Sequence, residues 1–198
     1  ANGLWASDAE VMLGHRRLSI IDTQEQSNQP FIHEATGDVL VFNGEVYNYR
    51  ELREELKGAF SFRTESDTEV VLAALQAWGA EALHRFNGMF AFAFWSREKR
   101  ELLLARDRMG IKPLYFSETS HGLVFSSELR SLLASGWIDR RHDPIALADY
   151  LRYQTVHAPR TIVQSVSMLP AGHLMRLQGE ETEISAWWDM PSETAKID

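Results

Sequence analysis

A strongly apolar pair of segments near the middle of the chain does most to limit its fold. The seven-residue run Met89 to Trp95 is followed by a polar turn, Arg97 to Arg100, and by a second apolar segment, Glu101 to Arg106. Two such runs joined by a short polar turn predict a β-hairpin. Because both strands are apolar at nearly every position, each must be covered on two faces. The sequence therefore predicts a layered protein with this hairpin inside it.

Shorter strand and helix signals occur on both sides of this hairpin. We predict a strand within residues 11–21, hairpins formed by 31–34 with 39–42 and by 114–116 with 123–125, and a strand pair around Gln178-Gly179. Helices are predicted over 48–58, from 67 to an interruption at Gly79, over 128–133 and over 143–153. Hairpins with helices grouped between them favour an α+β fold, so we expect two antiparallel sheets packed face to face with helices outside.

Local signals refine three of these boundaries. Asn48 with Glu51, and Ser66 with Glu69, have the spacing of a capping box at a helix start. Asn43-Gly44 has the composition of a turn at the end of a strand. The apolar residues after Ser66 recur with helical spacing, which predicts a helix with one apolar face.

Composition excludes several classes of function. The chain has 198 residues, a net charge of −8 and no cysteine. Its length suggests one domain, and its acidity argues against a nucleic-acid partner. The lack of cysteine excludes disulfides and thiolate zinc sites in the residues shown. No apolar run approaches the roughly 20 residues that cross a membrane, and no signal peptide is visible. We expect a cytoplasmic protein, either processed or a piece of a longer one, because the first residue is not Met.

Common catalytic and metal-binding motifs are missing. The sequence contains no GxGxxG, GxxxxGK[ST], HExxH or GxSxG motif. Its seven histidines are scattered, and no two have an i, i+4 spacing. We therefore expect no metal site.

Three polar positions lie where predicted elements begin or end: Arg17, Asn43-Gly44 and Asp67. If the fold brings them together, they form a receptor for an amino acid. A guanidinium binds an α-carboxylate, a carboxylate binds an α-ammonium, and a side-chain amide beside a glycine N–H forms an oxyanion hole. Each position also has an ordinary explanation: a surface ion pair for Arg17, a plain turn for Asn43-Gly44, and a helix N-terminus beside Ser66 for Asp67. Spacing alone does not decide between the two interpretations.

Six segments of the chain resemble one family. They are GHRRLSIID (14–22), FNGEVYNYRELREEL (42–56), TESDTEVVL (64–72), RDRMGIKPLYF (106–116), FSSELRSLL (125–133) and LPAGH (169–173). Together they resemble the glutaminase domain of asparagine synthetases, a class II glutamine amidotransferase of the N-terminal nucleophile hydrolase superfamily. The resemblance covers nearly the whole chain. Its second and fourth segments favour this branch over the amidotransferases that feed glucosamine-phosphate or phosphoribosylamine synthesis.

The resemblance implies a four-layer αββα sandwich that hydrolyses glutamine to glutamate and ammonia. It implies that Arg17 binds the α-carboxylate of glutamine and Asp67 its α-ammonium. The Asn43 side chain and the Gly44 N–H would form the oxyanion hole, and Glu45 would complete the substrate contacts. The pocket would be lined by main-chain groups of Leu18, Ser19, Ile20 and Ile21. In this family the nucleophile is an N-terminal cysteine whose α-amine is the general base.

The chain departs from the family pattern at both ends. The cysteine is absent, and the family's opening Met-Cys-Gly, first strands and Arg-Gly-Pro-Asp motif would precede the residues shown. We therefore expect residues 1–190 to be an N-terminally truncated glutamine amidotransferase domain that is inactive alone and lacks its first strands. Residues 191–198 would begin a linker to an absent ATP-dependent synthetase domain.

Two explanations of the missing cysteine remain. The chain is a fragment of a complete amidotransferase, or it is a degenerate relative that binds an amino acid or a partner without chemistry. We favour the fragment, since both ligand-charge partners and the oxyanion pair are retained together. The expected ammonia acceptor is aspartate, and the alternative is a sugar acid or other carboxylate in polysaccharide or secondary-metabolite synthesis. We expect glutamine as ligand, no cofactor in this domain, ATP and Mg²⁺ in the synthetase domain, and a homodimer.

Overall fold

The computed structural model describes residues 2–7, 10–16 and 27–190. Its strands are β1 (Asn2–Ala6), β2 (Met12–Arg16), β3 (Phe31–Ile32), β4 (Val39–Val46), β5 (Gly88–Ser96), β6 (Glu101–Arg106), β7 (Tyr115–Thr119), β8 (Gly122–Ser126), β9 (Ser167–Met168), β10 (His173–Gln178) and β11 (Glu181–Ala186). Its helices are α1 (Tyr49–Leu56), α2 (Asp67–Trp78), the 3₁₀ turn η2 (Gly79–Glu81), α3 (Ala82–Arg85), α4 (Leu129–Ala134) and α5 (Pro144–Tyr153).

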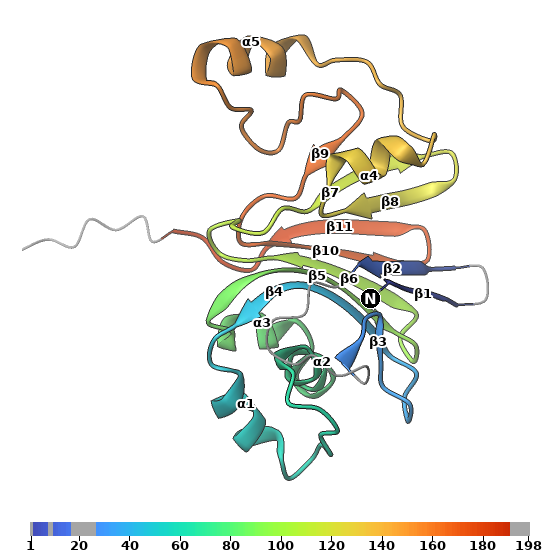
Figure 1. The fold of residues 1–198 in the computed structure, drawn as a ribbon, viewed down its shortest axis with the longest axis vertical. Coiled ribbons are helices and arrows are strands. Elements are labelled where there is room, and N and C mark those ends of the chain that lie inside the picture. The colour runs from blue at the N-terminus through green and yellow to red at the C-terminus, as the bar shows by residue number, and fades with distance from the viewer. Residues whose placement is uncertain (1, 8–9, 17–26, 191–198) are drawn as a thin grey trace, which may run out of the picture.

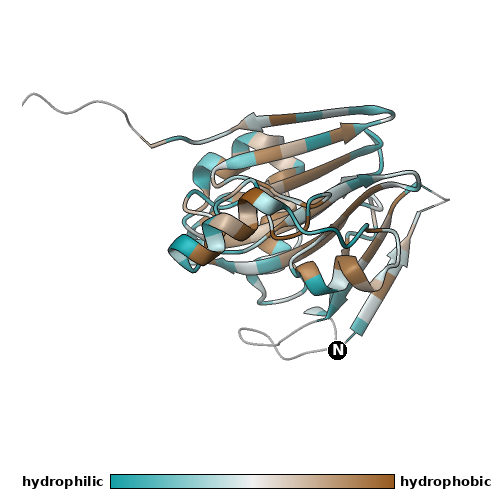
Figure 2. Ribbon diagram, turned by 90° about the horizontal axis from the view of Figure 1, so that it is seen from above, coloured by the Kyte–Doolittle hydropathy of each residue, from teal (hydrophilic) through white to brown (hydrophobic). Residues whose placement is uncertain are grey.

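A six-stranded antiparallel sheet forms the centre of the molecule, in the order β11-β10-β6-β5-β4-β3. The predicted apolar hairpin, β5 with β6, lies inside this sheet, as its composition required. Helices α1, α2 and α3 lie on one side of the sheets (Figure 1), and the central strands are hydrophobic along much of their length (Figure 2). Strand β4 pairs with β5 from Val39 opposite Trp95 to Val46 opposite Gly88.

A second strand layer covers the other face of this sheet. It consists of the pair β1-β2 and the three-stranded sheet β8-β7-β9. The two layers share one core cluster. The second layer contributes Leu13 of β2, with Leu114 and Leu169 beside β7 and β9, and the central sheet contributes Val41 and Leu104. Leu132 of α4 belongs to a further cluster on the outer side of the three-stranded sheet. The αββα order is therefore confirmed, but within the described residues the second layer is divided between two sheets.

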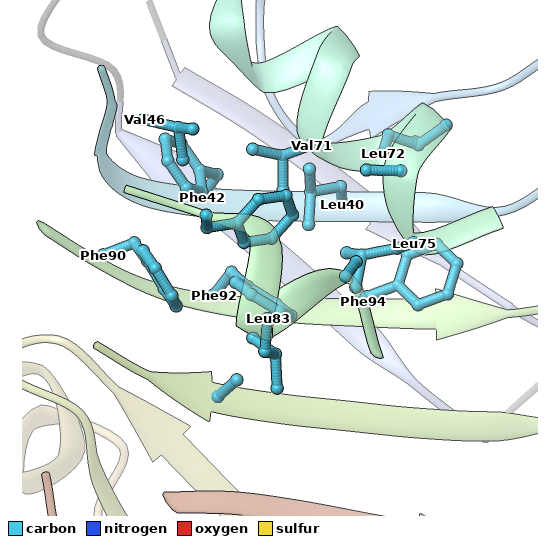
Figure 3. Close-up of a cluster of buried hydrophobic side chains, with 14 of the residues drawn as sticks. Leu40, Phe42, Val46, Val71, Leu72, Leu75, Leu83, Phe90, Phe92 and Phe94 are labelled. Atoms are coloured by element: carbon cyan, nitrogen blue, oxygen red, sulfur yellow. The ribbon is translucent and has the colours of Figure 1, made fainter. Parts of the chain in front are cut away.

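The largest core cluster joins the central sheet to the helices. Phe42 and Val46 lie on the face of β4 that is turned toward α2, in one cluster with Val71 of that helix (Figure 3). Phe90 and Phe92 of β5 stack with their ring centroids 5.8 Å apart. This packing fixes which face of β4 meets the helices and which meets the second strand layer.

Two local predictions were wrong. The segment Asn43–Glu45 is not a turn but the continuation of β4, which runs to Val46. Asn48 does not cap α1 with its side chain. Its Nδ2 instead donates to the Arg85 carbonyl at 3.0 Å, and its Oδ1 accepts from Asn87 N at 2.9 Å. A long-range partner thus replaces the local capping bond.

The second helix start was predicted in part. Ser66 caps α2 by accepting a hydrogen bond from Thr68 N at 3.1 Å. Glu69 does not return the bond, because its carboxylate accepts from the backbone N–H groups of Arg63 and Thr64. Helix α2 is also buried on all sides from Asp67 to Leu75, rather than having one apolar face. It ends at Gly79, where φ is 59°, as the sequence indicates.

The remaining elements agree with prediction except at two places. Strands β1 and β9 were not predicted. Strand β2 ends at Arg16, and the remainder of the predicted strand over 11–21 lies outside the described residues, as does the predicted linker 191–198. The hairpin of β7 with β8, the pair β10 with β11, and α4 are confirmed. Asp143 caps α5, accepting from Ile145 N at 2.8 Å. None of the helices in the described ranges is long and apolar enough to span a bilayer.

Candidate active site

The second half of β4 carries the polar residues that the sequence singles out. Side chains alternate between the faces of a strand, and Phe42 and Val46 point toward the helices while Val39 and Val41 belong to the cluster under the second strand layer. Asn43 and Glu45 therefore point toward the second layer, and both are half-buried. The end of β4 thus presents an amide and a carboxylate between the two strand layers.

Gly44 is a glycine because the neighbouring strand approaches closely. A Cβ at this position would lie 2.2 Å from the Met89 carbonyl oxygen and 2.6 Å from Phe90 Cα. Its residue type is thus explained by contact within a sheet, and not by the turn that Asn43-Gly44 suggested.

Within the described residues, the edge of β4 that faces away from β5 is bonded at two points, with an unbonded position between them. Phe42 N donates to Gln29 Oε1 at 2.6 Å, and Val46 N donates to Asp67 Oδ2 at 3.1 Å. In an antiparallel ladder, alternate residues direct their N–H groups to the same edge. The N–H of Gly44, which lies midway between these two residues, therefore points to this edge. Among the described residues it has no acceptor.

Asp67 is the first residue of α2, and only 5% of its surface is exposed. Burial raises the pKa of its carboxyl group, although hydrogen bonds from the backbone N–H groups of Val46 and Thr68 partly counter this effect. The neighbouring negative charge of Glu45 raises the pKa further. Within the described ranges no ion pair involves Asp67. A ligand cation would therefore relieve an unfavourable buried charge.

The arrangement fits an amino acid with a side-chain carbonyl. Gly44 and Val46 are two residues apart on a strand, which separates their N–H groups by about 7 Å. The Gly44 N–H and the Asp67 carboxylate, which is bonded to Val46 N, can thus bind an oxyanion and an ammonium at opposite ends of one extended ligand. In extended glutamine, five bonds separate the amide oxygen from the α-nitrogen, a span of about 6 Å, which is comparable to this separation.

The other predicted site residues lie outside the described part of the chain. They are Arg17, Leu18, Ser19, Ile20 and Ile21. The structure brings Asn43, Gly44, Glu45 and Asp67 together at the end of β4. Across residues 2–7, 10–16 and 27–190, no group of three or more His, Asp or Glu side chains is placed to hold a metal ion.

A cavity of about 600 Å³ lies at the opposite end of the same sheet. There the amide of Gln76 donates to Thr36 Oγ1 at 2.7 Å and to Asp38 Oδ2 at 2.6 Å. Asp38 also accepts from the backbone N–H of Arg97. Both oxygens of the Asp38 carboxylate are therefore hydrogen-bonded within the protein, whereas Asp67 accepts from Val46 N through Oδ2.

Comparison with known proteins decides the family. A model of the glutamine amidotransferase domain matches residues 1–188. The chain belongs to the glutamine amidotransferase domain family. It is 42% identical over 166 residues to asparagine synthetase [glutamine-hydrolyzing] 1 of Bacillus subtilis, covering 83% of this chain and 26% of that protein. It is also 42% identical over 133 residues to asparagine synthetase B [glutamine-hydrolyzing] of Escherichia coli, covering 67% of this chain and 24% of that protein.

The fold of this amidotransferase domain also matches solved structures. Glutamine phosphoribosylpyrophosphate amidotransferase of Bacillus subtilis aligns with a TM-score of 0.64 at 21% identity, covering 89% of this chain and 35% of the other. This likeness supports the fold assignment, and the sequence relatives support the asparagine synthetase branch. The chain spans about a quarter of the length of the two curated relatives named above.

One functional feature was missed by sequence reasoning. The open edge of β4 depends on Gln29, which is distant in sequence and has no motif around it. A glutamine before a proline and a short apolar segment has no distinctive local pattern, so only the pairing of β3 with β4 reveals its position.

Proposed function

We propose that this domain binds glutamine at the end of β4 and hydrolyses it to glutamate and ammonia within a larger, ATP-dependent amidotransferase. Asp67 binds the α-ammonium, the Asn43 amide and Gly44 N–H stabilise the tetrahedral oxyanion, and Glu45 contributes to the substrate contacts. Arg17 binds the α-carboxylate, and the main chain of residues 18–21 lines the pocket. The observation that carries the proposal is the Gly44 N–H, which has no acceptor in the described part of the chain and lies between two bonded positions on the β4 edge.

Preorganised donors explain how this arrangement would accelerate the reaction. The amide carbonyl of glutamine becomes negatively charged when a nucleophile attacks it, and donors already in place stabilise that charge without reorganisation. Removing one such donor typically lowers kcat by about 10²–10³-fold. The two donors at Asn43 and Gly44 belong to consecutive residues of a strand inside a sheet, so their separation is fixed by the fold.

The nucleophile comes from outside the 198 residues, because these contain no cysteine. A cysteine with a free α-amine placed beside the β4 edge would supply both nucleophile and general base. We propose that the ammonia then passes to a synthetase domain that activates a carboxylate with ATP and Mg²⁺. Aspartate is the preferred acceptor, in line with the names of the two relatives. A cytoplasmic location and a homodimer stay predictions.

The proposal is tested on the protein purified as it occurs naturally, whose intact mass is measured first. We expect a mass above 22.6 kDa, glutamine-dependent ammonia release, and loss of that release after thiol alkylation. Asn43→Ala should lower kcat about 10²-fold or more with a smaller change in KM. Asn2→Ala, at an exposed position on β1, is the control. Normal turnover in Asn43→Ala would contradict the assignment, and failure of the natural protein to bind glutamine would contradict the function itself.

A further inference from the structure

We propose that Gln29 is a positioning residue for the oxyanion hole, acting as a one-residue substitute for a neighbouring strand. This inference rests on the proposed function, since it concerns the Gly44 N–H. Gln29 has an exposed fraction of 6%. Its Nε2 donates to the Phe42 carbonyl at 3.1 Å, and its Oε1 accepts from Phe42 N at 2.6 Å. Its side-chain amide thus makes both hydrogen bonds that a paired strand residue would make.

The position of Gln29 follows from the register of β3 and β4. Phe31 of β3 is opposite Leu40, so the residue two places earlier, Gln29, reaches the level of Phe42. The strand pairing of β3 with β4 covers the two residues Phe31–Ile32. The side chain of Gln29 therefore adds a final pair of bonds after the backbone pairing has stopped.

Ending the ladder with a side chain has a consequence for Gly44. If β3 continued as backbone along β4, its next bonded residue would lie opposite Gly44 and would occupy that N–H. The side-chain amide of Gln29, by contrast, bonds the N–H and carbonyl of Phe42 and does not extend to Gly44. The amide of Gln29 thus fixes the β4 edge one residue before Asn43 while leaving the Gly44 N–H open.

Both sides of the site segment are consequently held. Asp67 bonds Val46 on the far side of Gly44, and β5 pairs with Asn43 and Glu45 on the opposite edge. The backbone of Gln29 also packs closely against β1, because a Cβ on Gly3 would lie 2.1 Å from the Gln29 carbonyl oxygen. The glycine at that position lets β1 pack directly on the backbone of Gln29.

Loss of the Gln29 amide leaves the N–H and carbonyl of Phe42 buried without partners, and such groups are expensive to leave unbonded. The strand edge must then shift or admit water. An oxyanion donor has to lie within about 2.7–3.1 Å of the developing charge, and a misplacement of about 1 Å can cost about 10²-fold in rate. Ground-state binding through Asp67 does not depend on this bond. The inference therefore predicts an effect on kcat rather than on KM.

The test uses Gln29→Met, which keeps the side-chain length and removes the amide, in the same natural protein. We expect kcat for glutamine hydrolysis to fall about 10-fold to 10²-fold while KM for glutamine changes less than about threefold. The matched control is Gln76→Met. Gln76 also donates two hydrogen bonds from its amide, to Thr36 and Asp38, but at the other end of the sheet. The Gln76→Met variant should therefore be less stable than the normal protein but keep its kcat.

Gln29→Glu provides an independent readout. Ionised, the new carboxylate accepts from Phe42 N but repels the Phe42 carbonyl oxygen. Protonated, it donates to that oxygen and restores both bonds. The ratio of variant kcat to normal kcat should therefore rise as pH falls, while the free energy of unfolding measured at each pH accounts for any change in folded fraction.

The outcomes separate the inference from the proposed function. If Asn43→Ala loses activity but Gln29→Met keeps its normal kcat, the positioning role is wrong. The same holds if Gln29→Met does not fold and Gln29→Glu folds without recovering activity in acid, or if neither variant folds at any pH. If the unaltered protein releases no ammonia from glutamine, the proposed function fails and the inference falls with it.

Discussion

The carboxylate of Asp67 accepts a hydrogen bond from the backbone N–H of Val46, with 3.1 Å between Oδ2 and N. This contact joins the first residue of α2 to the last residue of β4, 21 positions earlier in the chain. It places a buried negative charge two residues from the open N–H of Gly44. The start of the helix and the end of the strand therefore form one structural unit at the proposed glutamine site, and the packing of α2 on the central sheet brings its two halves together.

Replacing Asp67 should separate ligand binding from stability. Asn keeps an oxygen that can accept from Val46 N but carries no charge to bind an ammonium. We expect Asp67→Asn to weaken glutamine binding about 10-fold to 10²-fold, in line with the strength of a charge-assisted bond. Its thermal midpoint should equal or exceed the normal value, because a buried charge is removed. Calorimetric titration and thermal unfolding measure the two effects, and a lower midpoint with unchanged affinity would argue against this role.

The pKa of Asp67, raised chiefly by burial, predicts a pH dependence of binding. Only the ionised carboxylate binds the α-ammonium. As pH falls through the raised pKa, glutamine affinity should decline, and it should do so at a higher pH than an exposed aspartate would allow. Titrations of glutamine binding from neutral pH into acid measure this. An affinity that stays constant until the ordinary pKa range of aspartate would show that Asp67 is not the ammonium partner.

The same raised pKa has a consequence for stability. The folded protein holds this proton more tightly than the unfolded chain, so the contribution of Asp67 to stability decreases as pH rises from its ordinary pKa through the raised one. The advantage of Asp67→Asn over the normal protein should accordingly be full above the raised pKa and shrink in acid. Urea unfolding of both proteins at a series of pH values measures the difference. An advantage that grows toward acid would have the wrong sign.

Gly44 should tolerate no side chain. A Cβ there would meet the backbone of Met89 and Phe90, and these atoms belong to a paired strand that cannot shift alone. We expect Gly44→Ala to destabilise the domain by about 2 kcal/mol or more. Gly58→Ala is the matched control, since a Cβ at Gly58 meets nothing within 4 Å and should change stability by less than about 1 kcal/mol. Equal unfolding midpoints for the two variants in urea would contradict the close approach of β5.

The buried carboxylate of Asp107 should be a main determinant of stability. It accepts hydrogen bonds from the backbone N–H groups of Phe90, Met109, Ile111 and Lys112, and its exposed fraction is 1%. Asp107→Ala leaves these donors without partners, so we expect a loss of about 3–5 kcal/mol. Asp139→Ala, at an exposed ion pair with Arg141, should cost less than about 1 kcal/mol. Similar losses in chemical denaturation would refute this role.

The elements that the sequence predicts well are those whose signals are local. The hairpin of β5 with β6 depends on two apolar runs and a short turn, and the start of α5 depends on Asp143 and Pro144. Each of these patterns lies in one continuous stretch of the chain. The bonds that these patterns imply form in the fold, between β5 and β6 and from Asp143 to the start of α5.

The misread positions are those where a distant partner decides. Asn43-Gly44 has turn composition, but the approach of β5 makes Gly44 a packing requirement inside a strand. Asn48 has capping chemistry, but Arg85 and Asn87 use its amide. The role of Gln29 exists only because of the register of β3 on β4. The sequence singled out Asn43, Gly44, Glu45 and Asp67, and the structure shows how β4 and the start of α2 present them.

Glutamine binding at the end of β4 is best measured by a glutamine titration followed by amide NMR, because this experiment reports on Gly44 itself and needs no nucleophile. We expect glutamine to shift the backbone amide signal of Gly44 and the side-chain amide signals of Asn43. Asp67→Asn should weaken both responses, and the signal of Val39 at the other end of β4 should stay in place. Binding that leaves Gly44 and Asn43 unmoved, or no binding at all, would contradict this expectation.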